Sequence, residues 1–395
     1  MKYTEIKQIL DLKPLNKSID DNAFITHFLQ NPNSKNRINE IAKTIIAERS
    51  ESIEKIIKDI EWDIPFPFPE NTNFSFIDLF AGIGGFRMAL QNLGGKCVFS
   101  SEIDNSVKVT YEKNYGEFPF GDIKEFTGPN VSDDLLNKLI PDHNVLAAGF
   151  PCQPFSLAGV SARISLGQEH GFLDKIKGNL FFDIARIVSI KQPEVIFLEN
   201  VKNFHNHDEG NTFRTVKTTI EGLGYKLFSA IINSEQLVPQ SRRRFYMIGI
   251  RNDLLIRGDY TFPEFNGEPL KLRDFLEPNV PDIYTISDKL WTGHKNRTQR
   301  NIERGTGFTA HVADLDKPSK TLVARYGKDG KECLIPQDGQ NPRKLTPREC
   351  ARLQGFPEEF TLPVSRAAAY HQFGNSVSVP VIQAIAENFI NYLIE

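Results

Sequence analysis

The feature that most constrains the fold is a strand, a glycine-rich turn and a helix in direct succession. An apolar run at residues 74–80 predicts a buried strand, residues 81–85 (AGIGG) predict a tight turn, and residues 86–93 predict a helix. This succession opens the nucleotide-binding unit of α/β proteins, in which ligands bind at the carboxyl rim of the sheet. We therefore expect an α/β fold with its functional residues at this rim.

Three acidic residues at this rim indicate the kind of nucleotide. Asp78 lies beside the glycine turn, where a carboxylate suits a cationic ligand better than a pyrophosphate. Glu102 ends the next predicted strand, residues 97–101, and can accept hydrogen bonds from ribose hydroxyls. Asp122 can accept one from an adenine amino group. Arg87 occupies the place of the third glycine of a dinucleotide fingerprint. The pattern favours S-adenosylmethionine over NAD and argues against a dehydrogenase.

A cysteine between two prolines follows another predicted strand. The apolar run at residues 144–148 leads into residues 149–156 (GFPCQPFS), in which Pro151 and Pro154 restrict the backbone around Cys152. An isolated cysteine is more often a packing residue. Its place at a strand end and its polar neighbours favour a nucleophile instead.

Further along the chain, a carboxylate and a basic run are predicted near the same rim. The buried strand at residues 193–198 ends at Glu199, which would face the same side as Cys152. The run at residues 240–244 (QSRRR) directly precedes a strand at residues 245–250, a position suited to holding an anion or a carboxylate in place.

The flanking regions differ from this core. Residues 1–62 are predicted to be helical and separate, followed by a proline-rich linker at residues 62–69. Residues 274–344 are irregular, polar and basic, and residues 288–344 hold 12 Lys and Arg against 7 Asp and Glu. A local positive surface can bind phosphates although the whole chain has a net charge of −3. An amphipathic helix is expected at residues 381–393.

Composition excludes several classes of protein. The 395 residues are 40% hydrophobic and 25% charged, as in soluble globular proteins. No apolar run is long enough to cross a membrane, and the first residues lack the apolar core of a signal peptide. The four cysteines have no paired spacing, so we expect neither disulfides nor a metal site and assign the chain to a reducing cytoplasm.

Six motifs, in this order, resemble those of the DNA (cytosine-5)-methyltransferases of bacterial restriction–modification systems. The resemblance extends from about Phe74 to the C-terminus, and residues 149–160 and 326–330 are similar to the Dcm-type enzymes that methylate CCWGG. The motifs are residues 78–85, 149–156, 199–201, 240–244, 348–357 and 372–377.

The resemblance implies a Rossmann-like S-adenosylmethionine-dependent methyltransferase domain with a smaller, irregular target-recognition domain and an N-terminal helical extension. We expect an extension and linker at 1–72, a catalytic and cofactor-binding domain at 73–273, a target-recognition domain at 274–346, a hinge and connecting segment at 347–374, and a C-terminal helix at 375–395 that returns to the catalytic domain.

The resemblance also implies the chemistry. A cytosine is flipped out of a specific duplex site, and the Cys152 thiolate adds to its C6 atom. Glu199 hydrogen-bonds N3 and the exocyclic amine, while Arg242 and Arg244 secure the flipped base. The methyl group passes from S-adenosylmethionine to C5, and S-adenosylhomocysteine is the product. The implied partners are double-stranded DNA, bound by a monomer, and a cognate restriction endonuclease against which methylation protects the DNA.

The family's binding positions carry over onto this sequence. Phe80 stacks on the adenine, Glu102 binds the ribose, and Ile103 occupies a position where many relatives have tryptophan. The expected cofactor-binding residues are Asp78, Phe80, Ala81, Gly82, Gly84, Gly85, Glu102, Ile103, Asp122, Ile123, Pro151, Asn375, Ser376 and Val377. The expected DNA-binding residues are Gln153, Ser156, Arg297, Arg300, Arg304, Thr321, Arg325 and Lys328.

Two other functions are compatible with part of this pattern. A tRNA cytosine-5 methyltransferase would share the catalytic core, although the long basic region favours duplex DNA. A non-catalytic DNA-binding regulator would not need Cys152, Glu199 and Arg244, all of which are present.

Overall fold

The computed structural model describes residues 1–13, 20–50, 52–58, 60–151, 180–305 and 309–393. The chain divides into two compact units. The first unit comprises residues 1–232, 244–263 and 383–395, and the second comprises residues 233–243 and 264–382. Cys152, Gln153 and Ser156 lie outside the described residues.

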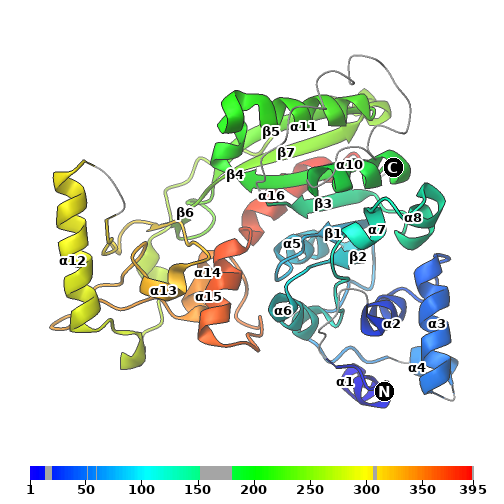
Figure 1. Ribbon diagram of the computed structural model, residues 1–395, viewed down its shortest axis with the longest axis horizontal. Helices are drawn as coiled ribbons and strands as arrows, with labels where there is room; N and C mark the ends of the chain where they lie inside the picture. The colour runs from blue at the N-terminus through cyan, green and yellow to red at the C-terminus, as the bar shows by residue number, and fades with distance from the viewer. Residues whose placement is uncertain (14–19, 51, 59, 152–179, 306–308, 394–395) are drawn as a thin grey trace. The chain divides into compact units, whose positions relative to one another are not determined.

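A mixed sheet organises the first unit. Its described strands follow the order β2-β1-β3-β4-β7-β5 (Figure 1). The first four are parallel, and β7 is antiparallel to β4. The predicted α/β fold is therefore confirmed. The strands are β1 (Phe74–Leu79), β2 (Gly95–Ser101), β3 (Val145–Gly149), β4 (Val195–Val201), β5 (Tyr225–Asn233) and β7 (Arg243–Arg251).

Helices cover this sheet. α5 packs on β1 and β2, whereas α10 contacts α7, α8 and α11. The remaining helices of this part of the chain include four from the N-terminal sixty residues. The bounds are α1 (Tyr3–Ile9), α2 (Asp21–Gln30), α3 (Arg37–Arg49), α4 (Ile53–Lys58), α5 (Gly85–Asn92), α6 (Asn105–Tyr115), α7 (Lys124–Thr127), α8 (Asp133–Leu139), α10 (Leu180–Lys191), η3 (Lys202–Gly210), α11 (Asn211–Gly222), η4 (Asn252–Arg257) and α16 (Val379–Ile390).

The N-terminal helices share the core of the sheet unit, which differs from the expectation of a separate segment. Ile25 and Phe28 of α2 are fully buried, as is Phe99 of β2. The rings of Phe24 and Phe120 meet edge to face, with centroids 5.1 Å apart. Periodicity reveals that a helix has an apolar face, but not which surface covers that face. Residues 62–69 form neither helix nor strand, as expected.

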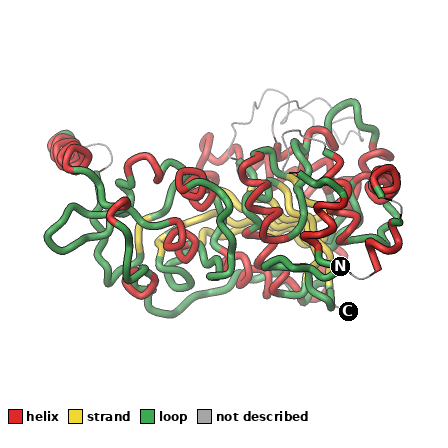
Figure 2. The backbone as a smooth tube through the Cα atoms, turned by 90° about the horizontal axis from the view of Figure 1, so that it is seen from below, coloured by secondary structure: helices red, strands yellow, loops and turns green. Residues whose placement is uncertain are grey.

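Much of the second unit is loop (Figure 2). Buried polar contacts help to hold it: the Arg343 guanidinium donates to both carboxylate oxygens of Glu349 at 2.8 Å. α14 begins at Pro347, with Thr346 as its N-cap. The elements are β6 (Gln240–Ser241), η5 (Leu272–Phe275), η6 (Asp282–Tyr284), α12 (Asp288–Glu303), β8 (Ser319–Lys320), α13 (Tyr326–Asp329), α14 (Pro347–Leu353) and α15 (Arg366–Asn375).

The sixteen-residue helix α12 was not predicted from the sequence. Ser287 caps its N-terminus by accepting a hydrogen bond from the Leu290 N–H. Within α12, all of which is described, His294 alone is buried. A helix without an apolar stripe leaves no hydrophobic period in the sequence, so this element is hidden from pattern analysis.

Candidate active site

The glycine turn after β1 begins the candidate site. Phe80, Gly82 and Gly84 have φ angles of 55°, 55° and 83°. A side chain at Gly84 would place its Cβ atom 2.3 Å from the Tyr115 ring, so close packing as well as backbone conformation requires glycine there. At Gly82, by contrast, an added Cβ would meet nothing within 4 Å, which leaves open space above the turn.

Glu102 is fixed beside this open space. Its two carboxylate oxygens accept hydrogen bonds from the Gly82 N–H at 2.9 Å and the Asp104 N–H at 2.8 Å. Its own N–H donates to the Phe120 carbonyl at 2.8 Å. Burial raises the pKa of Glu102, and the bonds from Asp104 and Gly82 oppose this shift. The carboxyl group is thus oriented before any ligand arrives.

The groups around Glu102 fit an adenosyl ligand. Ile103 is 68% exposed, an unusual position for a large apolar side chain, and Phe80 is half-buried. Phe120 forms a parallel β-bridge with Ser101, the last residue of β2. Asp122 and Ile123 follow Phe120 closely in the chain, so the bridge places them near the end of β2. Apolar surface, the fixed Glu102 carboxylate and open space above a glycine turn match the parts of S-adenosylmethionine.

The other expected cofactor residues occupy different positions. Asp78 is fully buried on β1; burial raises its pKa well above the ordinary value, and the nearby Arg87 opposes this. Pro151 is exposed just beyond β3. Ala81 and Gly84 are buried in the turn, and Gly85, also buried, begins α5. Asn375 ends α15 in the second unit, followed by Ser376 and Val377.

Glu199 and Arg244 meet at the rim, on neighbouring strands. Glu199 pairs with Gly149 of β3 on one side. On the other side, Arg244 of β7 pairs with Val201, two residues from Glu199, so the two side chains lie on the same face of the sheet. The Glu199 Oε1 and Arg244 Nε atoms are 3.2 Å apart.

Asn200 is a site residue that sequence reasoning missed. It is 2% exposed, and its Nδ2 atom donates to the Phe150 carbonyl at 2.9 Å. This bond fixes the backbone two residues before Cys152. The available signal was its position next to Glu199 inside the motif at residues 199–201.

Arg242 donates hydrogen bonds to backbone carbonyl groups. It belongs to the second unit, where its guanidinium donates to the Leu322 carbonyl at 3.0 Å and to the Ser376 carbonyl at 2.8 Å. Thr321 donates its hydroxyl to the Ser241 carbonyl at 2.8 Å. These contacts join Ser241 and Arg242 to Thr321 and Leu322 within the second unit.

The expected DNA-binding cations of the second unit are exposed. Arg297 and Arg300 lie on α12, and Arg304 is its C-cap. Lys328 lies on α13, and Arg325 forms a 3.7 Å ion pair with Glu332. All five side chains can therefore contact a ligand without any rearrangement of buried residues.

Across the described ranges, no three His, Cys, Asp or Glu side chains are grouped so as to hold a metal ion. No helix among the described residues is both long and apolar enough to cross a membrane.

The sheet order and the glycine turn after β1 define an α/β protein of the Rossmann-like class. The model of the C-5 cytosine-specific DNA methylase family matches residues 74–391. The chain belongs to this family, and it is a cytosine-5 DNA methyltransferase. Because the curated relatives are DNA methyltransferases, the tRNA alternative is less supported.

Several curated relatives are similar over most of their length. Type II methyltransferase M.SsoII of Shigella sonnei is 45% identical over 343 residues, which is 86% of this chain and 86% of that protein. The DNA-cytosine methyltransferase of Escherichia coli (strain K12) is 41% identical, covering 80% of this chain and 77% of that protein. M.HhaI of Haemophilus parahaemolyticus is 39% identical, covering 80% and 94%.

Solved structures share the fold. The S. pombe Dnmt2 methyltransferase has a TM-score of 0.60 at 22% identity, covering 81% of this chain and 99% of that one. The Entamoeba histolytica methyltransferase EhMeth has a TM-score of 0.61 at 20% identity, covering 83% and 100%.

Proposed function

We propose that this enzyme methylates C5 of a cytosine in a specific duplex DNA site, with Cys152 as its nucleophile. One arrangement carries the proposal. Gly149 lies beside Glu199 in the sheet, Asn200 holds the Phe150 carbonyl, and Arg244 contacts Glu199. The chain thus approaches Cys152 next to a buried carboxylate and its cation.

The residues at the rim supply what cytosine chemistry needs. C5 of cytosine is a poor nucleophile, so the ring must first become electron-rich. A bond forms between the Cys152 sulfur and C6, and the electron pair of the C5–C6 double bond moves to C5. Glu199 hydrogen-bonds N3 and the exocyclic amine, which favours the addition, and Arg244 holds Glu199 in place.

Glu102, Phe80, Ile103 and Asp122 hold S-adenosylmethionine in this proposal. When bound, S-adenosylmethionine supplies an electrophilic methyl group for C5, and S-adenosylhomocysteine is released. Loss of the C5 proton and cleavage of the C6–sulfur bond then restore the aromatic ring and free Cys152. We identify no side chain among the described residues as the base that removes this proton.

The partner is double-stranded DNA, from which the target base is flipped because a stacked cytosine is out of reach. We propose that the exposed cations of residues 274–346 provide recognition, with Gln153 and Ser156 near the flipped base. Methylation by a monomer would protect DNA from a cognate restriction endonuclease. The Type II names of the relatives support this pairing.

Bisulfite sequencing of a plasmid from cells expressing the protein tests the proposal. Wild-type protein is expected to leave one cytosine of a single short sequence unconverted, while Cys152→Ala leaves none. Total tRNA from the same cells is sequenced in parallel. Conversion of all plasmid cytosines, or protection confined to tRNA, would contradict the proposal.

A further inference from the structure

β2, which ends just before Glu102, lies at the edge of the sheet, where a bridge from Phe120 to Ser101 is the only strand-like pairing that the described residues give its last residues on that side. The Ser100 carbonyl accepts a hydrogen bond from the Phe120 N–H at 2.9 Å. The Ser100 N–H donates to the Nε2 atom of His27 at 3.2 Å. A side chain of the N-terminal helix α2 therefore accepts the hydrogen bond of a strand-edge N–H, next to the bridge that Phe120 makes.

His27 is set up to act as this acceptor. Its Nδ1 atom lies 2.8 Å from the Ala23 carbonyl, so Nδ1 carries the proton and the Nε2 lone pair faces Ser100. The ring is 3% exposed, and its tilted contact with Phe120, at 4.5 Å between centroids, helps to fix its orientation. Burial lowers the pKa of His27 and so favours the neutral acceptor form, although Glu117, whose Oε1 atom lies 3.4 Å from Nε2, opposes this shift.

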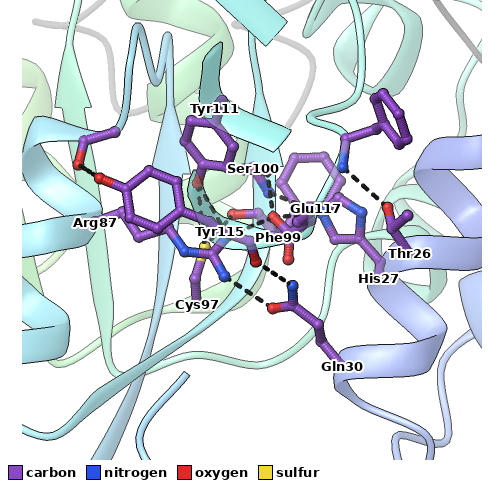
Figure 3. A network of polar contacts seen from close by, with 12 residues as sticks. Thr26, His27, Gln30, Arg87, Cys97, Phe99, Ser100, Tyr111, Tyr115 and Glu117 are labelled. Atoms are coloured by element: carbon purple, nitrogen blue, oxygen red, sulfur yellow. Dashed lines mark hydrogen bonds and ion pairs between the residues drawn. The ribbon is translucent and has the colours of Figure 1, made fainter. Parts of the chain in front are cut away.

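Two further side chains of α2 contact the same region (Figure 3). Thr26 accepts a hydrogen bond from the Phe118 N–H at 3.0 Å. Gln30 donates to the Tyr115 carbonyl at 2.7 Å and accepts from Arg87 at 2.8 Å. Thr26, His27 and Gln30 are all buried, so these bonds have no water to replace them.

The network continues to a buried carboxylate. Glu117 Oε1 accepts hydrogen bonds from Arg87 at 2.9 Å and from the Ser100 hydroxyl at 2.6 Å. Burial alone would lower the pKa of Arg87, but Glu117 raises it well above its ordinary value. Ser100 is thus held at its N–H, hydroxyl and carbonyl, two residues before Glu102.

We propose that His27 and Thr26 of the N-terminal extension are positioning residues for S-adenosylmethionine binding, acting through the end of β2 and Glu102. The inference rests on the proposed role of Glu102. In this view the extension is part of the support of the cofactor site. Its removal would leave the strand edge open behind the carboxylate.

Calorimetric affinity of the full-length protein for S-adenosylmethionine tests this. His27→Leu keeps the volume but removes the acceptor, and is expected to weaken binding roughly tenfold. His27→Gln, whose amide oxygen can reach the Ser100 N–H, should stay within about twofold. Phe28→Leu is the matched control: Phe28 is also buried on α2 but packs under Lys43 of α3. It should lower the melting temperature and leave affinity unchanged.

A double mutant separates this inference from the cofactor site itself. Glu102→Ala should weaken binding about ten- to a hundredfold. If His27 acts through Glu102, adding His27→Leu to Glu102→Ala should cause less than a twofold further loss. Full additivity would overturn the inference and leave Glu102 in the site. Unchanged affinity in Glu102→Ala would overturn both.

Thr26→Val provides a second test if His27→Leu does not fold. This isosteric change removes the acceptor for the Phe118 N–H while keeping the packing of α2. Weaker cofactor binding than in Phe28→Leu at equal melting temperature would support the inference. Equal affinities in these two variants would overturn it.

Discussion

Two charges meet at the rim, and neither is fully exposed to water. The Glu199 and Arg244 side chains are 11% and 15% exposed, with Oε1 and Nε 3.2 Å apart. Removing one member of such a pair leaves the other charge buried without its partner. At the scale of single residues, we therefore expect Arg244 to control both the charge and the orientation of Glu199.

Arg244→Met removes the cation but keeps most of the apolar stem. We expect turnover to fall about a hundredfold or more, as is usual when a charged donor is removed from an active site. Arg244→Lys keeps the charge without the planar guanidinium and should recover part of the loss. Rates of radiolabelled methyl transfer measure this, with S-adenosylmethionine affinity as the control. Wild-type turnover in Arg244→Met would exclude the proposed role.

At the scale of elements, α12 is the least expected part of the second unit. Arg297, Arg300 and Arg304 are separated by three and four residues, a spacing that aligns them along one side of the helix. Lys295 lies towards the opposite side, with its Nζ atom 5.6 Å from the centroid of the Trp291 ring. A helix with one cationic side fits the phosphates of a duplex.

This arrangement predicts a change in salt dependence. Replacing the three arginines by glutamine is expected to flatten the slope of log affinity against log salt by about two to three, roughly one for each phosphate that is no longer neutralised. Lys295→Gln serves as the control and should change the slope by well under one. Fluorescence anisotropy with a short duplex at several salt concentrations gives both values. Equal slopes in all three proteins would remove α12 from the DNA interface.

At the scale of the whole molecule, the sequence predicted the elements that are buried from both sides. Parallel strands such as β3 have continuous apolar runs, which Leu146 and Ala147 illustrate at 0% exposure. The tertiary partners of the N-terminal helices were not predictable, because the polar groups of His27 and Gln30 become informative only when Ser100 and Arg87 are in place. The roles of the candidate site residues remain predictions.

Acid stability is a property of the whole molecule that one buried histidine should influence. Burial lowers the pKa of His143 from 6.5 to about 4, although its hydrogen bond to the Pro141 carbonyl opposes the shift. The unfolded chain therefore binds a proton below about pH 6.5 that the folded chain refuses until about pH 4, so stability falls as the pH decreases through this window.

Between pH 7 and pH 5 this residue should cost about 2 kcal/mol of unfolding free energy. His143→Asn retains a donor for the Pro141 carbonyl but does not titrate, so the stability gap between it and the wild type should shrink by that amount. Urea unfolding at both pH values measures the gap. A gap independent of pH would show that His143 does not resist protonation.

The central claim, that Cys152 forms a covalent bond with cytosine in DNA, has a direct test. A duplex with 5-fluorocytosine at the methylated position is incubated with S-adenosylmethionine and the protein, because fluorine cannot leave C5 as a proton does and the enzyme stays attached. The wild type is expected to form a complex that survives denaturing electrophoresis, and peptide mass spectrometry should locate the base on Cys152. Cys152→Ala should form none. A denaturation-resistant complex with the Cys152→Ala protein, or a wild type that is never trapped at its methylated site, would contradict this account.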